Sequence, residues 1–364
     1  MKKTVEAAFI TLAVIICYFF LISPARISYK SSKPPSPTEN PVPAFVPNPI
    51  TIEGVFVENH TKMKDLPTEK IRTLIATGDV IPARAVNFQV LKLNNFLWPW
   101  EKTAEVLSAA DITLINLEAP LLKNCQPTNQ GMVFCGDQRH IDGLKFSGVD
   151  VVNLANNHLG NYGPQGAEET VNLLKTNEIE SCGVGEWALK NILGLRFAFL
   201  GYNDVGTSPN PVSPAEENLI ASQIKAAREQ ADLIIVSFHW GNEYVTQPSI
   251  RQRDLAHLAV DSGADLVIGN HPHWIQPVEI YKDKIITYAH GNFIFDQTWS
   301  EETKKGVIGR YTFYENKLID AEFSPIYIQG YGQPNFLPAE EGNKILREMK
   351  EASLKLAQEN LGKT

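Results

Sequence analysis

The stretch from residue 265 to residue 273 reads Asp-Leu-Val-Ile-Gly-Asn-His-Pro-His. Its apolar run, residues 265–268, ends at a glycine, which predicts a buried strand that runs out into a loop. His271 and His273 follow, and Pro272 between them favours an extended conformation for His271. In an extended loop, side chains two residues apart lie on the same side, so both imidazoles can converge on one point. Because imidazole is a common metal ligand, this pair suggests a metal site at the carboxyl end of the strand.

Four other apolar runs end in the same way, each followed by a side chain that can bind a metal ion. They are residues 74–77 before Asp79, residues 112–117 before Glu118, residues 151–155 before Asn157 and His158, and residues 233–238 before His239. In open α/β sheets, ligands bind outside the carboxyl ends of the strands. Core packing does not explain five strands that deliver such side chains to one rim, so we expect a functional site there.

The order of the predicted elements indicates the fold class. Segments with strand and helix spacing alternate over residues 71–268, and paired β segments follow over residues 277–323. This order predicts an α/β domain, with a mixed sheet or a sheet sandwich and helices outside. Residues 213–216, Ser-Pro-Ala-Glu, predict a capping box at the start of one helix. The spacing of residues 339–361 predicts an amphipathic helix that packs on the outside.

The N-terminal part of the chain differs in composition from the rest. Lysines at positions 2 and 3 precede an apolar run, so residues 1–25 are interpreted as a cytoplasmic stub with a transmembrane anchor, or alternatively as a cleaved signal segment. Residues 26–54 are rich in proline and indicate a semi-rigid linker. The main domain, residues 55–330, and the amphipathic helix in residues 331–364 are then expected outside the cytoplasm. They would be tethered to the cell membrane by a single pass, or secreted if the segment is cleaved.

Charge and cysteine usage narrow the partners and the compartment. The net charge is −8 and no dense run of Lys and Arg occurs, which argues against nucleic acid as a partner. An anionic substrate would have to be held by a metal ion or by local arginines such as Arg84, whose alternative is a surface ion pair. In an exported domain, Cys125 and Cys135 are expected to close a short disulfide, the alternative being two unrelated thiols. Cys182 would remain as a buried thiol.

The candidate ligands mix oxygen and nitrogen donors: Asp79, Glu118, Asn157, His239, His271 and His273. Such mixed coordination suits Mn, Zn, Fe or Ni better than Mg or Ca. The set is large enough for one or two divalent ions, and two ions about 3.5–4 Å apart can clamp the attacking and leaving oxygens in phosphoester hydrolysis. His158 is adjacent to a ligand and is the candidate catalytic acid.

Six short motifs occur in order: Gly78-Asp79, Asn116-Leu-Glu118, Asn156-Asn-His158, His239-Trp-Gly-x-Glu-Tyr244, Gly269-x-His-Pro-His273 and Gly291-Asn-Phe-Ile-Phe-Asp-Gln297. Together they resemble the CapA family of capsule-synthesis proteins, which is associated with poly-γ-glutamate production and belongs to the calcineurin-like metallophosphoesterase superfamily. The resemblance covers about residues 71–330. It implies a metallophosphoesterase-like β-sandwich flanked by helices, in an α-β-β-α arrangement.

The resemblance also implies a role for each ligand: Asp79 and His273 on one ion, Asn157, His239 and His271 on a second, Glu118 as the bridge, and His158 as the acid. The chain departs from the family or superfamily pattern at several places. Ile81 replaces the histidine of the first Asp-x-His motif, which leaves the first ion one imidazole short. The bridging residue is Glu118 where the wider superfamily has Asp, and Asn161 stands where the family commonly has Asp.

Two functional hypotheses of different classes follow. In the first, an exported, membrane-tethered hydrolase acts on an anionic capsule polymer or a phosphoester substrate, with Arg84, Glu243 and Asn292 contacting the substrate. Glu243 alternatively orients His239 or is a solvated loop charge. In the second hypothesis, the domain is a non-catalytic accessory subunit of a membrane polymer synthase. A phosphatase that acts on nucleotides or lipids at the cell surface differs from the first hypothesis only in its substrate.

Overall fold

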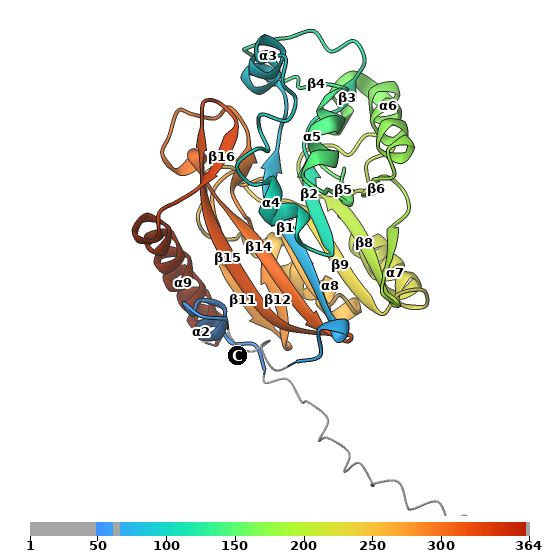
Figure 1. Cartoon of the computed structure of the whole chain (residues 1–364). Coiled ribbons are helices and arrows are strands. Elements are labelled where there is room, and N and C mark those ends of the chain that lie inside the picture. The colour runs from blue at the N-terminus through green and yellow to red at the C-terminus, as the bar shows by residue number, and fades with distance from the viewer. Residues whose placement is uncertain (1–48, 61–65, 362–364) are drawn as a thin grey trace, which may run out of the picture. The chain divides into compact units, whose positions relative to one another are not determined.

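The computed structural model describes residues 49–60 and 66–361 of the unit Pro47–Thr364 (Figure 1). The predicted membrane or signal segment, residues 1–25, lies outside the described residues, as does the linker as far as residue 48. Within the two described ranges, none of the helices has the length and apolar character that crossing a membrane requires.

Two main β-sheets form the centre of the domain. The first has the strand order β16 (Gln333–Phe336), β15 (Lys317–Gln329), β14 (Lys305–Tyr314), β1 (Ile71–Val80), β2 (Ile112–Leu117), β5 (Val151–Asn153) and β6 (Glu180–Cys182), and β13 (Asn292–Ile294) also pairs with β1. The second has the order β11 (Val278–Tyr281), β12 (Lys284–Thr287), β10 (Leu266–Asn270), β9 (Leu233–His239), β8 (Leu195–Asn203) and β7 (Ala188–Ile192). A short parallel pair, β3 (Leu121–Leu122) and β4 (Gly136–Asp137), stands apart.

The helices connect these strands and cover the sheets (Figure 1). The α-helices are α2 (Ile52–Val55), α3 (Arg84–Leu93), α4 (Ala104–Ser108), α5 (His140–Phe146), α6 (Gly163–Thr176), α7 (Glu217–Arg228), α8 (Ile250–Ser262) and α9 (Ala339–Leu361). Three short 3₁₀ helices are η1 (Thr68–Lys70), η2 (Leu159–Tyr162) and η3 (Glu302–Lys304). The predicted α/β class is thus confirmed.

Alternation of side chains along the strands builds three apolar layers. Leu74 of the first sheet and Phe197 of the second belong to one buried cluster between the sheets. Their neighbours in the sequence face outward: Ile75 packs with residues of α4, α5 and α6, and Ala198 packs with residues of α7 and α8. The layers are therefore helix, sheet, sheet and helix, and the core between the sheets sets the distance between their strand ends.

The C-terminal helix α9 has the bounds that its spacing predicts. Its apolar side, with Ile345 and Met349, belongs to the cluster between the sheets instead of lying only against an outer face. The Ser353 hydroxyl accepts a hydrogen bond of 2.9 Å from the backbone N–H of Val278, at the edge strand β11. Figure 1 shows α9 beside β15 and α2, so this helix closes one open side of the sandwich.

The predicted capping box at residues 213–216 is wrong. Ser213 and Ala215 are extended, and their backbones exchange hydrogen bonds of 2.9 Å with Asn203, the last residue of β8. Helix α7 begins only after Glu216, whose side chain caps nothing. The capping box of this domain is in α8, where Ser249 and Gln252 cap each other.

The core between the sheets generates a first prediction. Leu266 is 0% exposed in that core, whereas Leu193 is 75% exposed. Leu266→Ala should lower the free energy of unfolding by about 2–5 kcal/mol, because it removes buried methyl groups and leaves a cavity. Leu193→Ala should change it by less than about 0.5 kcal/mol. Urea denaturation of both variants measures this, and equal losses would contradict the assigned layers.

Candidate metal centre

Strands of both sheets deliver the candidate ligands to one rim. The ligands are Asp79 near the end of β1, Glu118 after β2, Asn157 after β5, His239 at the end of β9, and His271 and His273 after β10. Ligand atoms of Glu118, His239 and His271 lie within 4.8 Å of one another, as do those of Asp79, Glu118 and His273. The Asn157 amide oxygen lies 2.8 Å from His239 Nε2. The structure therefore brings all six predicted ligands together.

Asp79 is held by a network of buried polar groups. Its Oδ1 accepts a hydrogen bond of 2.9 Å from the Asn116 amide, and its Oδ2 accepts one of 3.2 Å from the His271 backbone N–H. The Asn116 oxygen in turn accepts a 3.0 Å bond from the Asn153 amide on β5. Sequence reasoning did not assign roles to Asn116 and Asn153. The available signal was an asparagine within each of two otherwise apolar strands.

Glu118 is the most unusual group at this rim. It is 0% exposed, and among the described residues neither of its carboxylate oxygens has a hydrogen-bond partner. His239 Nε2 lies 3.3 Å from its Oε1, and His158 Nε2 lies 4.0 Å away. Burying a carboxylate is costly unless it is paired or coordinates a metal ion. An orphaned carboxylate that faces imidazole nitrogens fits a bound cation.

The turn from His271 to His273 is not the extended loop that the sequence predicts. His271 has φ 96° and His273 has φ 57°, so both lie in the left-handed region that non-glycine residues rarely adopt. The preference for an extended residue before Pro272 is overridden, because the His271 N–H turns to donate to Asp79. Strained backbone of this kind is typical of functional sites.

Burial and charge set the protonation of the imidazoles. Burial lowers the pKa of His239 to about 3 and that of His271 well below its ordinary value. Burial also lowers the pKa of His273, but its hydrogen bond with Asp79 and the charge of Glu118 outweigh that effect and raise it to about 9. Burial and the nearby Asp79 charge raise the pKa of Glu118 well above 4.5. A bound cation would favour the ionised carboxylate and the neutral imidazoles, which is the state that ligands need.

His158 lies beside the ligands, under an aromatic ring. Its Nδ1 is 2.9 Å from the Asn161 amide oxygen, and Phe134 stacks on it with 4.2 Å between ring centroids. Burial lowers the pKa of His158 to about 4. Asn161 stands where the family commonly has an aspartate. Because its amide is neutral, it does not stabilise a positive charge on the His158 ring as a carboxylate would.

The cysteine pair supports the loop that covers His158. Cys125 and Cys135 form a disulfide, and Cys182 is a buried free thiol. Phe134, which stacks on His158, is the residue next to Cys135. The bridge therefore restrains the loop at the point where it meets the site.

The three predicted substrate contacts have different surroundings. Arg84 forms an ion pair with Asp296, and its guanidinium lies about 5 Å from the centroids of Phe134 and Phe295. Asn292 is fully buried; its oxygen is 2.9 Å from His273 Nδ1 and its amide donates to the Thr303 carbonyl. Asn292 therefore positions His273 and is not placed to touch a substrate. Glu243, partly buried, has a carboxylate oxygen within 4.8 Å of ligand nitrogens of His271 and His273.

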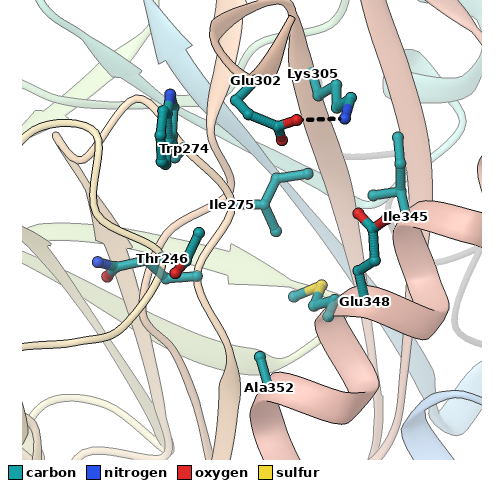
Figure 2. Close-up of a pocket in the computed structure, with 10 residues that line it drawn as sticks. Thr246, Trp274, Ile275, Glu302, Lys305, Ile345, Glu348 and Ala352 are labelled. Carbon is teal, nitrogen blue, oxygen red and sulfur yellow. Dashed lines mark hydrogen bonds and ion pairs between the residues drawn. The ribbon is translucent and has the colours of Figure 1, made fainter.

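Figure 2 shows a separate pocket, which Trp274 and Ile275, just after His273, help to line. Its volume is about 90 Å³, and none of the candidate ligands lines it. The lining includes the loop after His273, residues of η3 and β14, and α9. Glu302 of η3 and Lys305 of β14 form an ion pair of 2.7 Å. Ligand pockets usually measure about 300–1,000 Å³, so this one is too small for a polymer unit.

The chain belongs to a family of bacterial capsule proteins. Residues 73–297 match the family described as bacterial capsule synthesis protein PGA_cap, and this match spans more than half of the chain. It contains the whole rim described above, from Asp79 to Asn292. The resemblance found in the sequence motifs is thus confirmed.

Curated relatives agree with this assignment. The chain is 30% identical over 309 residues to a Bacillus anthracis protein named capsule biosynthesis protein CapA, covering 79% of this chain and 74% of that protein. It is 31% identical to the Bacillus subtilis PGA biosynthesis protein CapA, covering 61% of this chain and 63% of the relative, which is less than two thirds of its length. A Mycobacterium tuberculosis protein named "Probable polyglutamine synthesis accessory protein" is 30% identical, with 61% and 66% covered.

The buried carboxylate generates a second prediction. In metal-free protein at neutral pH, Glu118→Gln should raise the free energy of unfolding by about 1–3 kcal/mol, because it removes a buried carboxylate whose oxygens have no hydrogen-bond partner among the described residues. The folded-state pKa of Glu118 lies above its ordinary 4.5, so the wild type loses stability as the pH rises past that value. The gain from the substitution should therefore shrink toward pH 4.

Thermal and urea unfolding in the presence of a chelator measure this effect. The exposed Glu168 provides a matched control, because Glu168→Gln removes the same charge from the surface. Excess Mn²⁺ should reverse the order and make the wild type more stable than Glu118→Gln. If Glu118→Gln instead destabilises the metal-free protein, the carboxylate has a partner and the interpretation is wrong.

Proposed function

We propose that this chain acts in the synthesis, attachment or export of an anionic capsule polymer, poly-γ-glutamate, through metal-dependent hydrolysis at the rim. The names of the relatives support the process, because they concern capsule, PGA and polyglutamine synthesis. The observation that carries the chemistry is the fully buried Glu118, whose carboxylate lacks hydrogen-bond partners in the described part of the chain and faces His239, 3.3 Å away. On this proposal the domain is a metallophosphoesterase-like hydrolase.

The residues divide the work as follows. Asp79, Glu118, Asn157 and the three histidines would hold one or two divalent ions, with Mn, Zn, Fe or Ni as the candidates that suit mixed oxygen and nitrogen ligands. When bound, the metal would supply a Lewis acid that polarises a phosphoester or amide-like bond and activates water. The hydrogen bonds of Asn116 and Asn292 orient the ligands Asp79 and His273.

His158 is the proposed proton donor to the leaving group. Asn161 holds its Nδ1, so its Nε2 lies toward Glu118. The ring is neutral at pH 7, because burial lowers its pKa to about 4. An anionic substrate group next to the ring would raise that pKa and allow His158 to give up a proton.

The proposed location is the outer side of the cell membrane. Residues 1–25 would anchor the chain, and the proline-rich residues that follow, up to residue 48, would hold the domain away from the surface. The predicted linker as far as residue 54 is too long, because Ile50 and Ile52 are buried in the core of the domain. The domain that follows would be catalytic, and its last helix lies in residues 331–364. The disulfide between Cys125 and Cys135 supports an oxidising compartment. The partners on this proposal are the polymer and, at the membrane, the synthase that makes it.

A non-catalytic accessory role in a membrane synthase complex is the second candidate function. It is favoured by Ile81, which is buried among Ala83, Ala119, Phe134 and Phe295 and offers no ligand to the first ion. The name of the M. tuberculosis relative contains the word accessory. On this alternative the rim binds metal or polymer without turnover.

Loss of a ligand separates the two functions. His239→Ala should lower hydrolysis of a phosphodiester probe and of poly-γ-glutamate on the order of 100-fold or more, with loss of bound metal, because it removes an imidazole from the rim. Asn157→Ala should behave alike. His257→Ala is the matched control: this histidine lies on α8, bonded to Glu279, and its loss should leave both readouts unchanged.

Turnover assays and elemental analysis of the same preparations decide the outcome. The accessory role would be favoured if the wild-type protein binds metal but hydrolyses both substrates no faster than His239→Ala does. Wild-type protein without metal and without turnover would remove the proposed chemistry altogether. Circular dichroism checks that each variant is folded.

A further inference from the structure

The first ion position is one ligand short in this chain. Asp79, Glu118 and His273 provide three ligand groups whose atoms lie within 4.8 Å of one another. Ile81, two residues after Asp79, is 0% exposed and packs in an apolar cluster. Protein sites for transition metals usually have at least four ligands. A further protein ligand would therefore complete this position, or leave a single coordination site open to water.

The loop after β9 carries such a group to the same place. The backbone N–H of Trp240 donates to the Asn270 carbonyl at 3.1 Å, and the backbone N–H of Tyr244 donates to the Pro272 carbonyl at 2.8 Å. These two bonds fasten the loop on either side of Glu243 to the turn that carries the histidines. Tyr244 adopts a left-handed φ of 62°, which is unfavourable for an aromatic residue and indicates that the loop conformation is imposed.

The Glu243 carboxylate faces the histidines from this loop. One of its oxygens lies within 4.8 Å of ligand nitrogens of His271 and His273. In the described part of the chain, no Lys or Arg forms an ion pair with it, whereas the nearby Arg84 is paired with Asp296. Glu243 is thus oriented toward the histidines of the rim and is partly exposed.

His273 links this carboxylate to the first ion position. Its ligand nitrogens lie within 4.8 Å of Asp79 and Glu118 in one group of ligand atoms, and of Glu243 and His271 in another. Glu118 and His271 Nδ1, both without hydrogen-bond partners among the described residues, are buried beside the same space.

We propose that Glu243 is a metal ligand that completes the position of Asp79, Glu118 and His273, in place of the imidazole that Ile81 cannot supply. This inference rests on the proposed metal-dependent function and specifies its cofactor. With three carboxylates and one imidazole, the position is richer in oxygen than the Asn157, His239 and His271 side. Carboxylate ligands suit Mn²⁺, whereas imidazole suits Zn²⁺, so this position takes Mn²⁺.

Titration calorimetry with MnCl₂ on metal-free full-length protein tests the assignment. Wild type should bind two equivalents, and Glu243→Gln should lose one or weaken it by roughly 10–100-fold or more. Glu168→Gln, an exposed carboxylate with the same charge change, should bind as wild type. In a His239→Ala background, where the other position is impaired, one equivalent should remain, and adding Glu243→Gln should remove it.

The outcomes separate this inference from the proposed function. Two equivalents in both wild type and Glu243→Gln, with equal affinities, would overturn the role of Glu243 and leave the dinuclear centre standing. No Mn²⁺ bound by wild type would overturn both. One equivalent that is lost in His239→Ala but kept in Glu243→Gln would show that the first position holds no ion, and would also overturn the inference.

Discussion

The burial of Glu118, whose carboxylate has no hydrogen-bond partner among the described residues, is the constraint on which the rest of the rim depends. Its carboxylate is completely enclosed, and three histidines lie around it, of which His239 and His271 have depressed pKa values and His273 a raised one. A domain of this size has only a modest margin of stability, so an unpaired buried charge is kept only where a bound partner compensates for it. A cation bound at the rim would therefore stabilise the fold and serve the proposed chemistry through the same carboxylate.

The fold supplies the geometry for this arrangement. Because β1 and β2 are parallel, as are β9 and β10, their carboxyl ends meet, and the core between the sheets holds the two sets of strand ends at a constant separation. Buried amides then fix the ligands: Asn153 bonds to Asn116, which bonds to Asp79. Unfavourable backbone at His271 is tolerated because its N–H pairs with the Asp79 carboxylate.

Two loops surround the candidate metal centre. The disulfide loop places Phe134 on His158 and beside Arg84, and the loop after β9 places Glu243 on the histidine turn. Both loops lie at the rim and not in the core. Sequence changes in such loops can alter function with little effect on folding. A carboxylate in place of an imidazole would alter the metal preference of one position while the rest of the sandwich stays the same.

The sequence by itself indicated the α/β class, the family and the six candidate ligands that the structure brings together at the rim, because periodicity and polar residues at strand ends are local signals. It also indicated the pairing of Cys125 with Cys135. Only the tertiary structure decided the hydrogen bond of Asn116 with Asp79, the position of Glu243 beside His271 and His273, the left-handed turn at His271 and the extended backbone at Ser213. Each of these depends on contacts between residues far apart in the chain, where packing and buried hydrogen bonds override local preference.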